Sequence, residues 1–238
     1  MKKPVVSSRG QKSKTVHRNQ VDESFLREVY NRLFTIYGPQ HWWPGETPFE
    51  VCVGAILTQN TSWTNVEKAT HKMKSARCFS IQHLIDIQQD DLAELIRSAG
   101  YFNQKAKKLQ IFAGHIKTHY QGHLSHLLRK PGPELRRELL SLWGIGDETA
   151  DSMVLYAAGH PSFVVDAYTR RMFSRLGCCS PDVSYADLQS MFMARLEHDT
   201  PLYNEYHALI VRFGKEQCKS KPLCGNCPLS DICRFRPH

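Results

Sequence analysis

Apolar residues recur along this chain at every third or fourth position, which is the period of an α-helix. The first stripe ends at Gly38-Pro39 and consists of Leu26, Val29, Leu33 and Ile36. The segment from Phe49 to Leu57 is almost wholly apolar, as in a helix buried on all sides. Alternation of apolar and polar residues, the pattern of a half-buried strand, is nearly absent. The pattern therefore predicts an all-α fold.

The helical period continues through the second half of the chain. An apolar run covers 150–158 and stops at Gly159. Ser184 to Asp187 has the spacing of a capping box, so a helix is expected to begin there. No repeat of solenoid type is present. The apolar positions of these helices are Leu109, Phe112 and Ile116, then Leu135 and Leu139, then Leu188, Met191, Phe192 and Leu196.

The chain has 238 residues, 41% of them hydrophobic, which is enough for one large or two modest domains. No run of about 18 apolar residues occurs, so we expect no membrane span. Residues 1–20 are basic, contain no acid and lack the apolar stretch of a secretion signal. We interpret them as a solvated, disordered tail; a tail that touches DNA phosphates and a transit peptide are the alternatives.

The formal net charge is +8 at pH 7. Such a charge is typical of proteins that bind nucleic acid, but a merely solvated basic surface gives the same value. Charge alone leaves both interpretations open.

Eight cysteines are present, and four of them lie close to the C-terminal end. Without a secretion signal, closely spaced cysteines indicate metal binding more than disulfides. The four are separated by five, two and five residues and are Cys218, Cys224, Cys227 and Cys233. Four thiolates hold a structural zinc ion or a 4Fe-4S cluster, and zinc sites usually contain two close pairs where this chain has one. The remaining four, expected as small buried side chains, are Cys52, Cys78, Cys178 and Cys179.

A glycine-rich turn, Leu142-Trp-Gly-Ile-Gly146, lies between two helical patterns. Glycines two positions apart let the backbone turn tightly and leave N–H groups bare at the start of the next helix, where an anion such as a DNA phosphate is favoured. A Gly-x-Gly alone usually marks a plain helix–helix turn. Farther on, after an apolar helix, comes Val164-Val165-Asp166. By itself, Asp166 is explained equally by a plain N-cap for the helix that bears Arg170 and Arg171.

Hairpin, helix, loop, apolar pair and aspartate in this order resemble the helix-hairpin-helix, Gly/Pro-rich and Asp signature of the endonuclease III superfamily of DNA glycosylases. The resemblance implies two helical domains with a DNA cleft between them. A six-helix domain, 49–159, carries the hairpin, and an iron–sulfur cluster domain comprises 21–48 and 160–238. It further implies a monomer that binds double-stranded DNA with damaged bases, works in the cytoplasm at the bacterial nucleoid, and uses Asp166 in catalysis.

The cysteine spacing is similar to that of the cluster loop of endonuclease III, which has one more residue in its first gap. This resemblance implies a 4Fe-4S cluster rather than zinc, with a structural role to which redox sensing could be added. The cationic residues Lys219, Lys221 and Arg234 match the way that loop presents positive charge to the DNA backbone.

Two further segments resemble the DNA-facing loops of the superfamily. Thr58 to Trp63 closes the apolar helix, and Gln59 matches the polar residue that wedges into the duplex; a satisfied polar cap is the alternative. Gly100 to Ala106 is similar to the family's Gly-x-x-x-x-Lys-Ala turn, where Tyr101 or Phe102 would probe the opposite strand. The expected DNA contacts are Gln59, Tyr101, Lys105, Gly144, Ile145, Gly146 and Thr149.

The pair Trp42-Trp43 with Pro44, together with Trp63, could simply belong to the core. However, residues 24–177 resemble the bacterial endonuclease III-like 3-methyladenine DNA glycosylases, in which a Trp-Pro and an aromatic residue at the Trp63 position sandwich the flipped base. The resemblance implies a base pocket made of Trp43, Pro44 and Trp63. One departure is that this group generally lacks the four-cysteine cluster.

In bifunctional members of the superfamily, a lysine after the hairpin attacks C1′ of the sugar and then cuts the strand. The matching residue here is Glu148, whose carboxylate cannot form a Schiff base. We therefore expect water as the nucleophile and an uncut strand, with Asp166 and Glu148 as the catalytic candidates. Asp166 would stabilise positive charge on the sugar and accept a proton from water. Trp43 and Trp63 would attract a cationic alkylated base by about 0.5–2 kcal/mol each.

Other functions stay open at this point. A similar monofunctional enzyme could remove uracil, or thymine from mismatches. Removal of adenine opposite oxidised guanine is less favoured because the chain ends directly after the cysteine loop. A non-catalytic DNA-binding module would need neither Asp166 nor an aromatic slot, and a redox-only cluster protein would need no hairpin.

Overall fold

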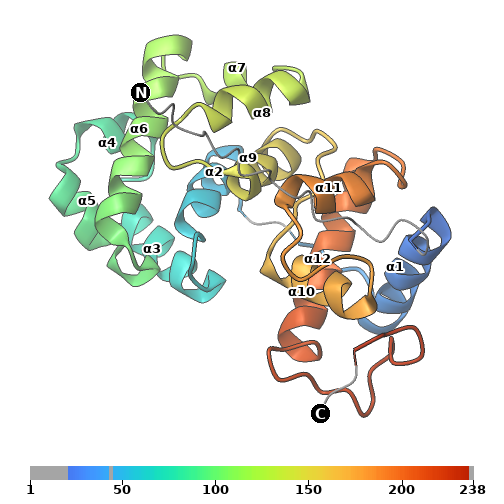
Figure 1. Ribbon diagram of the computed structural model, residues 1–238. Helices are drawn as coiled ribbons and strands as arrows, with labels where there is room; N and C mark the ends of the chain where they lie inside the picture. Colours follow the sequence, from blue (N-terminus) through green and yellow to red (C-terminus); the bar gives the residue numbers. More distant parts are fainter. Residues whose placement is uncertain (1–20, 43–44, 236–238) are drawn as a thin grey trace, which may run out of the picture.

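Figure 1 shows the computed structural model, which describes residues 21–42 and 45–235. The basic tail 1–20 and the expected base-pocket residues Trp43 and Pro44 lie outside this part. Within it every regular element is a helix and no strand occurs, so the all-α prediction is confirmed. None of the helices described is both long and apolar enough to cross a membrane.

The first two helices begin and end where their sequences predict. α1 (Glu23–Tyr37) starts after Asp22, whose side chain accepts a backbone N–H of the first turn, and it stops at Gly38, which has a φ of 64°. α2 (Pro48–Leu57) has its proline in the first turn, where no helical N–H is needed. All residues from Val51 to Leu57 are buried, which places α2 in the middle of the molecule.

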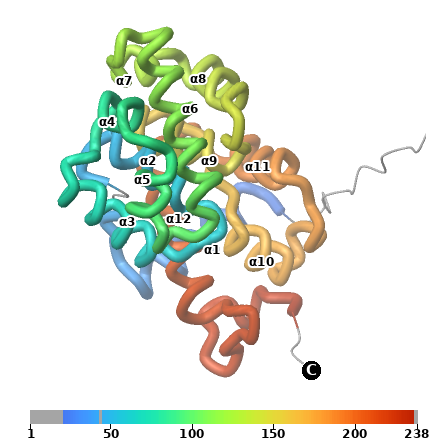
Figure 2. Tube along the Cα trace, turned by 90° about the vertical axis from the view of Figure 1, so that its left-hand side faces the viewer, coloured from blue at the N-terminus to red at the C-terminus, as the bar shows by residue number. Residues whose placement is uncertain are grey.

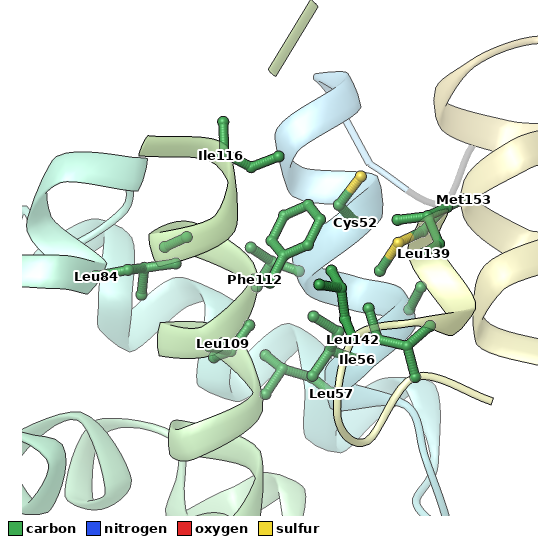
Figure 3. Close-up of a cluster of buried hydrophobic side chains, with 14 of the residues drawn as sticks. Cys52, Ile56, Leu57, Leu84, Leu109, Phe112, Ile116, Leu139, Leu142 and Met153 are labelled. Atoms are coloured by element: carbon green, nitrogen blue, oxygen red, sulfur yellow. The ribbon is translucent and has the colours of Figure 1, made fainter. Parts of the chain in front are cut away.

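The first hydrophobic core is built from α2 and the helices that follow it, with α6 packed against α2, α4 and α5. Figure 3 shows Phe112 reaching from α6 toward α2, where Cys52 and Ile56 lie; all three side chains are fully buried. The other elements around this core are α3 (Trp63–Ser75), α4 (Ile81–Asp86), α5 (Gln89–Leu95), the 3-10 turn η1 (Arg97–Ala99), α6 (Phe102–Tyr120), α7 (Leu124–Leu128), α8 (Gly132–Leu140) and α9 (Asp147–Ser152).

The second core surrounds α12, which packs against α1, α10 and η2. Its centre is aromatic: the rings of Phe163 and Phe192 stack 3.9 Å apart, and Tyr206 meets both edge-on. In Figure 1 these helices gather on one side of the molecule, and Figure 2 shows the chain after α12 folded into a loop at one end. The elements are η2 (a π-helix, Met153–Ala157), α10 (Ala167–Leu176), α11 (Tyr185–Met193) and α12 (Thr200–Glu216).

The two cores divide inside continuous helices. Val51 packs into the second core and its neighbour Cys52 into the first, while Val154 belongs to the first core and Leu155 to the second. Consequently α2 and the α9–η2 helix each carry side chains into both cores. Residues on these two helices are held rigidly relative to α12.

Three details refine the sequence predictions. Ile36 belongs to the first apolar stripe but is exposed, because only the Leu26, Val29 and Leu33 side of α1 packs against the core. Ser184 caps α11 by accepting the N–H of Asp187 at 3.0 Å, as predicted. Leu196 is buried but follows the end of α11.

Candidate active site

Asp166 stands at the junction of a buried extended segment and α10. Its Oδ1 atom accepts the backbone N–H of Thr169 at 2.7 Å and the hydroxyl of the same residue at 2.9 Å, so it is the N-cap of α10. Its Oδ2 atom faces Nε2 of His207 at 3.6 Å. The carboxyl group is therefore fixed through one oxygen by the helix, while the other oxygen points toward α12.

The surroundings of Asp166 favour its charged form. Burial raises the pKa of this carboxyl group, but the interaction with the His207 side chain and the two hydrogen bonds from Thr169 outweigh burial and bring the pKa below its ordinary value. Asp166 is thus a carboxylate at neutral pH. A buried anion beside a helix N-terminus is suited to stabilising positive charge that develops next to it.

Glu148, in the first turn of α9, behaves in the opposite way. Although the residue as a whole is exposed, the protein around its carboxyl group and the charge of Asp166 together raise its pKa to about 7. His207 and Arg170 act against this rise. Near neutral pH, Glu148 can therefore both hold and release a proton, whereas Asp166 stays ionised.

Three aromatic side chains that the sequence analysis did not select lie at this site. His207 is buried on α12, and its Nδ1 atom is 2.5 Å from the hydroxyl of Tyr156 in η2. The ring of Trp42 stacks against His207 at 5.5 Å and against Tyr156 at 6.4 Å. A histidine or tyrosine within an apolar helix is ordinarily a core residue, so no sequence signal distinguished these two.

The hairpin between α8 and α9 has the form that its glycines predict. Gly144 has a φ of 85°, and a Cβ atom there would lie 2.5 Å from the side chain of Lys108. A Cβ atom at Gly146 would meet open space. No side chain in the described part of the chain caps α9. The first N–H groups of α9 are therefore left without a protein partner among the described residues and can donate hydrogen bonds to an anion.

Gln59, in the loop after α2, and Lys108 of α6 connect this loop to the hairpin. Gln59 donates through Nε2 to the carbonyl oxygen of Gly144 at 3.0 Å and to the hydroxyl of Thr149 at 2.9 Å, and its Oε1 atom accepts from Lys108 at 2.5 Å. The ammonium group of Lys107 lies 4.9 Å from the centre of the exposed Trp143 ring. The two loops thus form one continuous unit.

Three of the expected DNA contacts have buried side chains, so contacts of these residues with DNA through their backbone stay a prediction. Lys105 is 1% exposed and donates to the carbonyl oxygens of Leu57 and Ala99. The Ile145 side chain is buried under the hairpin, and Thr149 is occupied by its bond from Gln59. These residues hold the loops together, because a buried side chain cannot reach a duplex.

Tyr101 differs from those three residues. It is 66% exposed and has a left-handed backbone, with a φ of 46°, at the start of α6. Its neighbour Phe102 packs against the first core and under the guanidinium group of Arg97. Tyr101 is therefore the aromatic side chain of this turn that is free to contact a ligand.

Trp63 lies beside a separate cavity between α2 and α3. The other lining residues are Glu50, Gly54, Glu67, Thr70, His71 and Lys74, and none of them belongs to the Asp166 site. Because Trp43 and Pro44 are outside the described residues, the expected three-residue base pocket stays a prediction.

The four C-terminal cysteines line one cavity together with apolar side chains of α10 and α12. Arg175 fixes this loop by donating to Sγ of Cys218 at 3.2 Å and to the carbonyl oxygens of Lys219 and Ser220. Within residues 21–42 and 45–235, no three metal-binding side chains stand close enough to hold a single ion.

A positively charged hollow lies between α10 and the cysteine loop. Its lining includes Arg170, Arg171, Arg175 and Arg234. Arg171 also bonds the carbonyl oxygens of Gly214 and Cys218, which keeps its guanidinium group in place. The hollow therefore joins the N-terminal region of α10, where Asp166 lies, to the loop.

Comparison with known proteins identifies relatives over most of the chain. The family model for HhH-GPD superfamily base excision DNA repair protein matches residues 53–198. A candidate DNA repair glycosylase of Methanocaldococcus jannaschii is 47% identical over 210 residues, which are 87% of this chain and 95% of that protein. A thymine-DNA glycosylase of Aeropyrum pernix is 28% identical over 225 residues, 90% of this chain and 97% of that protein.

Solved structures give the same result. A trapped covalent intermediate of endonuclease III with DNA matches with a TM-score of 0.77 and 26% identity, covering 89% of this chain and 95% of that one. The H. pylori 3-methyladenine DNA glycosylase bound to 1,N6-ethenoadenine matches with a TM-score of 0.68 and 28% identity, covering 82% of this chain and 97% of that one.

Proposed function

The chain belongs to the HhH-GPD superfamily of base excision DNA repair proteins, and we propose that it is a monofunctional DNA glycosylase that hydrolyses alkylated bases, such as 3-methyladenine, from double-stranded DNA. The observation that carries this proposal is the pair of unlike carboxyl groups, Asp166 and Glu148. Two neighbouring carboxyl groups with separated pKa values are typical of an acid–base pair. Neither can form a Schiff base, which strand cleavage by a lysine requires.

The proposed reaction assigns a different step to each carboxyl group. The N-glycosidic bond breaks, its electron pair leaves with the base, and positive charge grows on the sugar beside Asp166. A water oxygen bonds to C1′, and its proton passes to Glu148, whose pKa of about 7 makes it the better base at neutral pH. The sequence analysis gave this proton to Asp166, but its lowered pKa makes it a weaker base.

Cationic alkylpurines suit this site because they leave without being protonated by the enzyme. The likeness to the 3-methyladenine DNA glycosylase of H. pylori supports this choice of substrate. The aromatic stack of Trp42 on Tyr156 and His207 adds π-rich surface next to Asp166, which attracts an electron-poor base.

DNA would lie across the hairpin, the Gln59 loop and the arginine hollow. Backbone N–H groups at the start of α9 and the guanidinium groups of Arg170 and Arg234 supply contacts for phosphates. The exposed Tyr101 and Trp143 rings supply surfaces on which unpaired bases stack. We propose that the enzyme acts as a monomer on chromosomal DNA at the nucleoid.

The four cysteines fit a 4Fe-4S cluster better than zinc. Two observations support this choice: all four cysteines line one cavity, and their spacing contains one close pair where zinc sites usually contain two. Cys218, Cys224, Cys227 and Cys233 would hold it, and the cluster would keep the loop and Arg175 in shape without entering the reaction. Purified protein should contain iron and absorb broadly in the visible range; stoichiometric zinc without iron would refute this assignment.

The substrate assignment is tested with a panel of duplexes that carry 3-methyladenine, 1,N6-ethenoadenine, uracil, or thymine opposite guanine. We expect release of the alkylated base and a strand that breaks only after alkali treatment. Release of thymine or uracil alone would favour the function of the Aeropyrum pernix relative. A covalent DNA adduct trapped by borohydride would show that a lysine acts as the nucleophile.

A further inference from the structure

Tyr156, His207 and Asp166 form a line of polar groups that enters the site from three separate elements. The hydroxyl of Tyr156 is 2.5 Å from Nδ1 of His207, and Nε2 of the same ring is 3.6 Å from Oδ2 of Asp166. His207 is 6% exposed and Tyr156 is 7% exposed. Of these three groups, only Asp166 takes part in a chemical step of the proposed reaction.

The position of the hydrogen on His207 follows from its neighbours. Nε2 is buried and has no hydrogen-bond partner within 3.5 Å in the described residues, and the Asp166 carboxylate lies 3.6 Å from it. A lone pair on Nε2 would face an anion, which is repulsive, whereas an N–H there is attracted. With the hydrogen on Nε2, Nδ1 accepts the hydroxyl hydrogen of Tyr156.

Tyr156 is suited to remain the donor. Burial raises the pKa of its hydroxyl well above the ordinary value, and the charge of Asp166 raises it further, so the hydroxyl keeps its hydrogen. The residue lies in the π-helix η2, whose wide turn is contacted directly by α12. π-Helical turns inside helices are frequent at functional sites.

Other charged groups face this line as well. The negative charge of Asp166 raises the pKa of Glu148 on α9, and Arg170 on α10 opposes that rise. Trp42 covers the Tyr156 and His207 rings from the segment between α1 and α2. His207 is thus shielded from water, and the hydroxyl of Tyr156 and the carboxylate of Asp166 are its polar partners.

We propose that Tyr156 and His207 are positioning residues: Tyr156 fixes the Nε2–H tautomer of His207, and that N–H holds Asp166 ionised and aimed at the sugar. The catalytic role of Asp166 rests on the proposed function. The tautomer claim is independent of that function, because it concerns only the folded protein.

The tautomer is measured first, without DNA. In protein labelled with ¹⁵N at histidine, long-range ¹H–¹⁵N correlation spectra distinguish the two tautomers, and His207→Gln identifies the signals of His207. At pH 8 we expect the Nε2–H form in the wild type. Any other protonation state of this ring would overturn the proposal, whether or not the protein has glycosylase activity.

The effect on Asp166 is measured by the pH dependence of single-turnover base release, on the panel duplex from which the wild type releases a base. Tyr156→Phe and His207→Phe should shift the acidic limb of the pH–rate profile to higher pH by about 1–3 units. In both variants the N–H of His207 no longer holds down the pKa of Asp166, so burial raises that pKa. His207→Gln, which retains a donor, should restore much of the wild-type profile.

Tyr203→Phe is the matched control. Its hydroxyl is also buried, on α12, but it has no hydrogen-bond partner in the described residues. This variant should keep the wild-type profile. If Tyr156→Phe and His207→Phe lose the same rate at every pH, with no shift of the acidic limb of the pH–rate profile, the two residues only pack in the core and the proposal is overturned. If the wild type releases no base from any duplex of the panel, the proposed function fails and the tautomer measurement alone decides.

Discussion

The side-chain amide of Gln59 donates to the carbonyl oxygen of Gly144 at 3.0 Å, although 85 residues separate the two. This bond fastens the loop after α2 to the hairpin that precedes α9. Lys108 completes the joint by donating to Gln59 from α6. The Gln59 loop, the hairpin and α6 are therefore connected before any DNA binds. A substitution in one of these segments should alter the position of the other two.

Lys105 should act on stability rather than on DNA contact. Lys105→Met keeps the length of the side chain but leaves the carbonyl oxygens of Leu57 and Ala99 without their donor, and each unsatisfied buried group costs about 1–3 kcal/mol. We expect a clear drop in the free energy of unfolding in urea. The exposed Lys107→Met should lose about 1 kcal/mol or less, the size of a cation–π contact at the surface. Equal stability of Lys105→Met and wild type would contradict this role.

Gly146→Ala should weaken DNA binding while leaving the fold intact. The added methyl group meets no protein atom and the φ of Gly146 suits any residue, but Gly146 is the N-cap of α9, so we expect the methyl group to crowd a phosphate bound there. Loss of one amide–phosphate bond, about 1.5–3 kcal/mol, lowers the affinity about tenfold or more. Titration of a fluorescent duplex measures this.

Gly114→Ala serves as the control for the hairpin variant. Its methyl group also meets open space, but on α6, away from the hairpin turn. It should bind DNA as tightly as the wild type. If Gly146→Ala also binds the duplex with wild-type affinity, the hairpin is only a turn between two helices and does not bind DNA.

Glu148 should make stability depend on pH. Its pKa is about 7 in the folded protein and lies near the ordinary value of 4.5 in the unfolded chain. The folded state therefore binds more protons between these values, and stability falls as the pH rises from about 4.5 to about 7. Glu148→Gln cannot ionise, so it should be more stable than the wild type at pH 8 but not at pH 4. Urea unfolding at both pH values measures the difference, and a difference that is the same at both would argue against a raised pKa.

Asp166→Asn should separate chemistry from folding. Asparagine caps a helix about as well as aspartate, so the bonds from Thr169 and the start of α10 should survive. The missing negative charge should lower the rate of base release by about 10²–10⁴. Affinity for a duplex with an abasic-site analogue should stay close to that of the wild type. Full activity in this variant would remove Asp166 from the mechanism.

The helices and the local geometry of the site were determined by the sequence itself. Helical periodicity, the Gly144 turn and the cap at Asp166 depend on residues within a few positions of one another, so the apolar pattern and the turn residues predict them. The same holds for the spacing of the four cysteines, which restricts them to one loop. Family resemblance added the proposed role of Asp166 and the expectation that Glu148 stands where bifunctional members have a lysine.

Only the tertiary structure decided which polar side chains are buried and what they touch. Lys105 looked like a DNA contact because a lysine is usually exposed, but packing of α6 against the end of α2 encloses its ammonium group between two carbonyl oxygens. Tyr156 and His207 are 51 residues apart and meet because η2 and α12 pack together. Such contacts depend on how distant segments share a core, and the apolar pattern around each residue is the same whether or not a polar partner faces it.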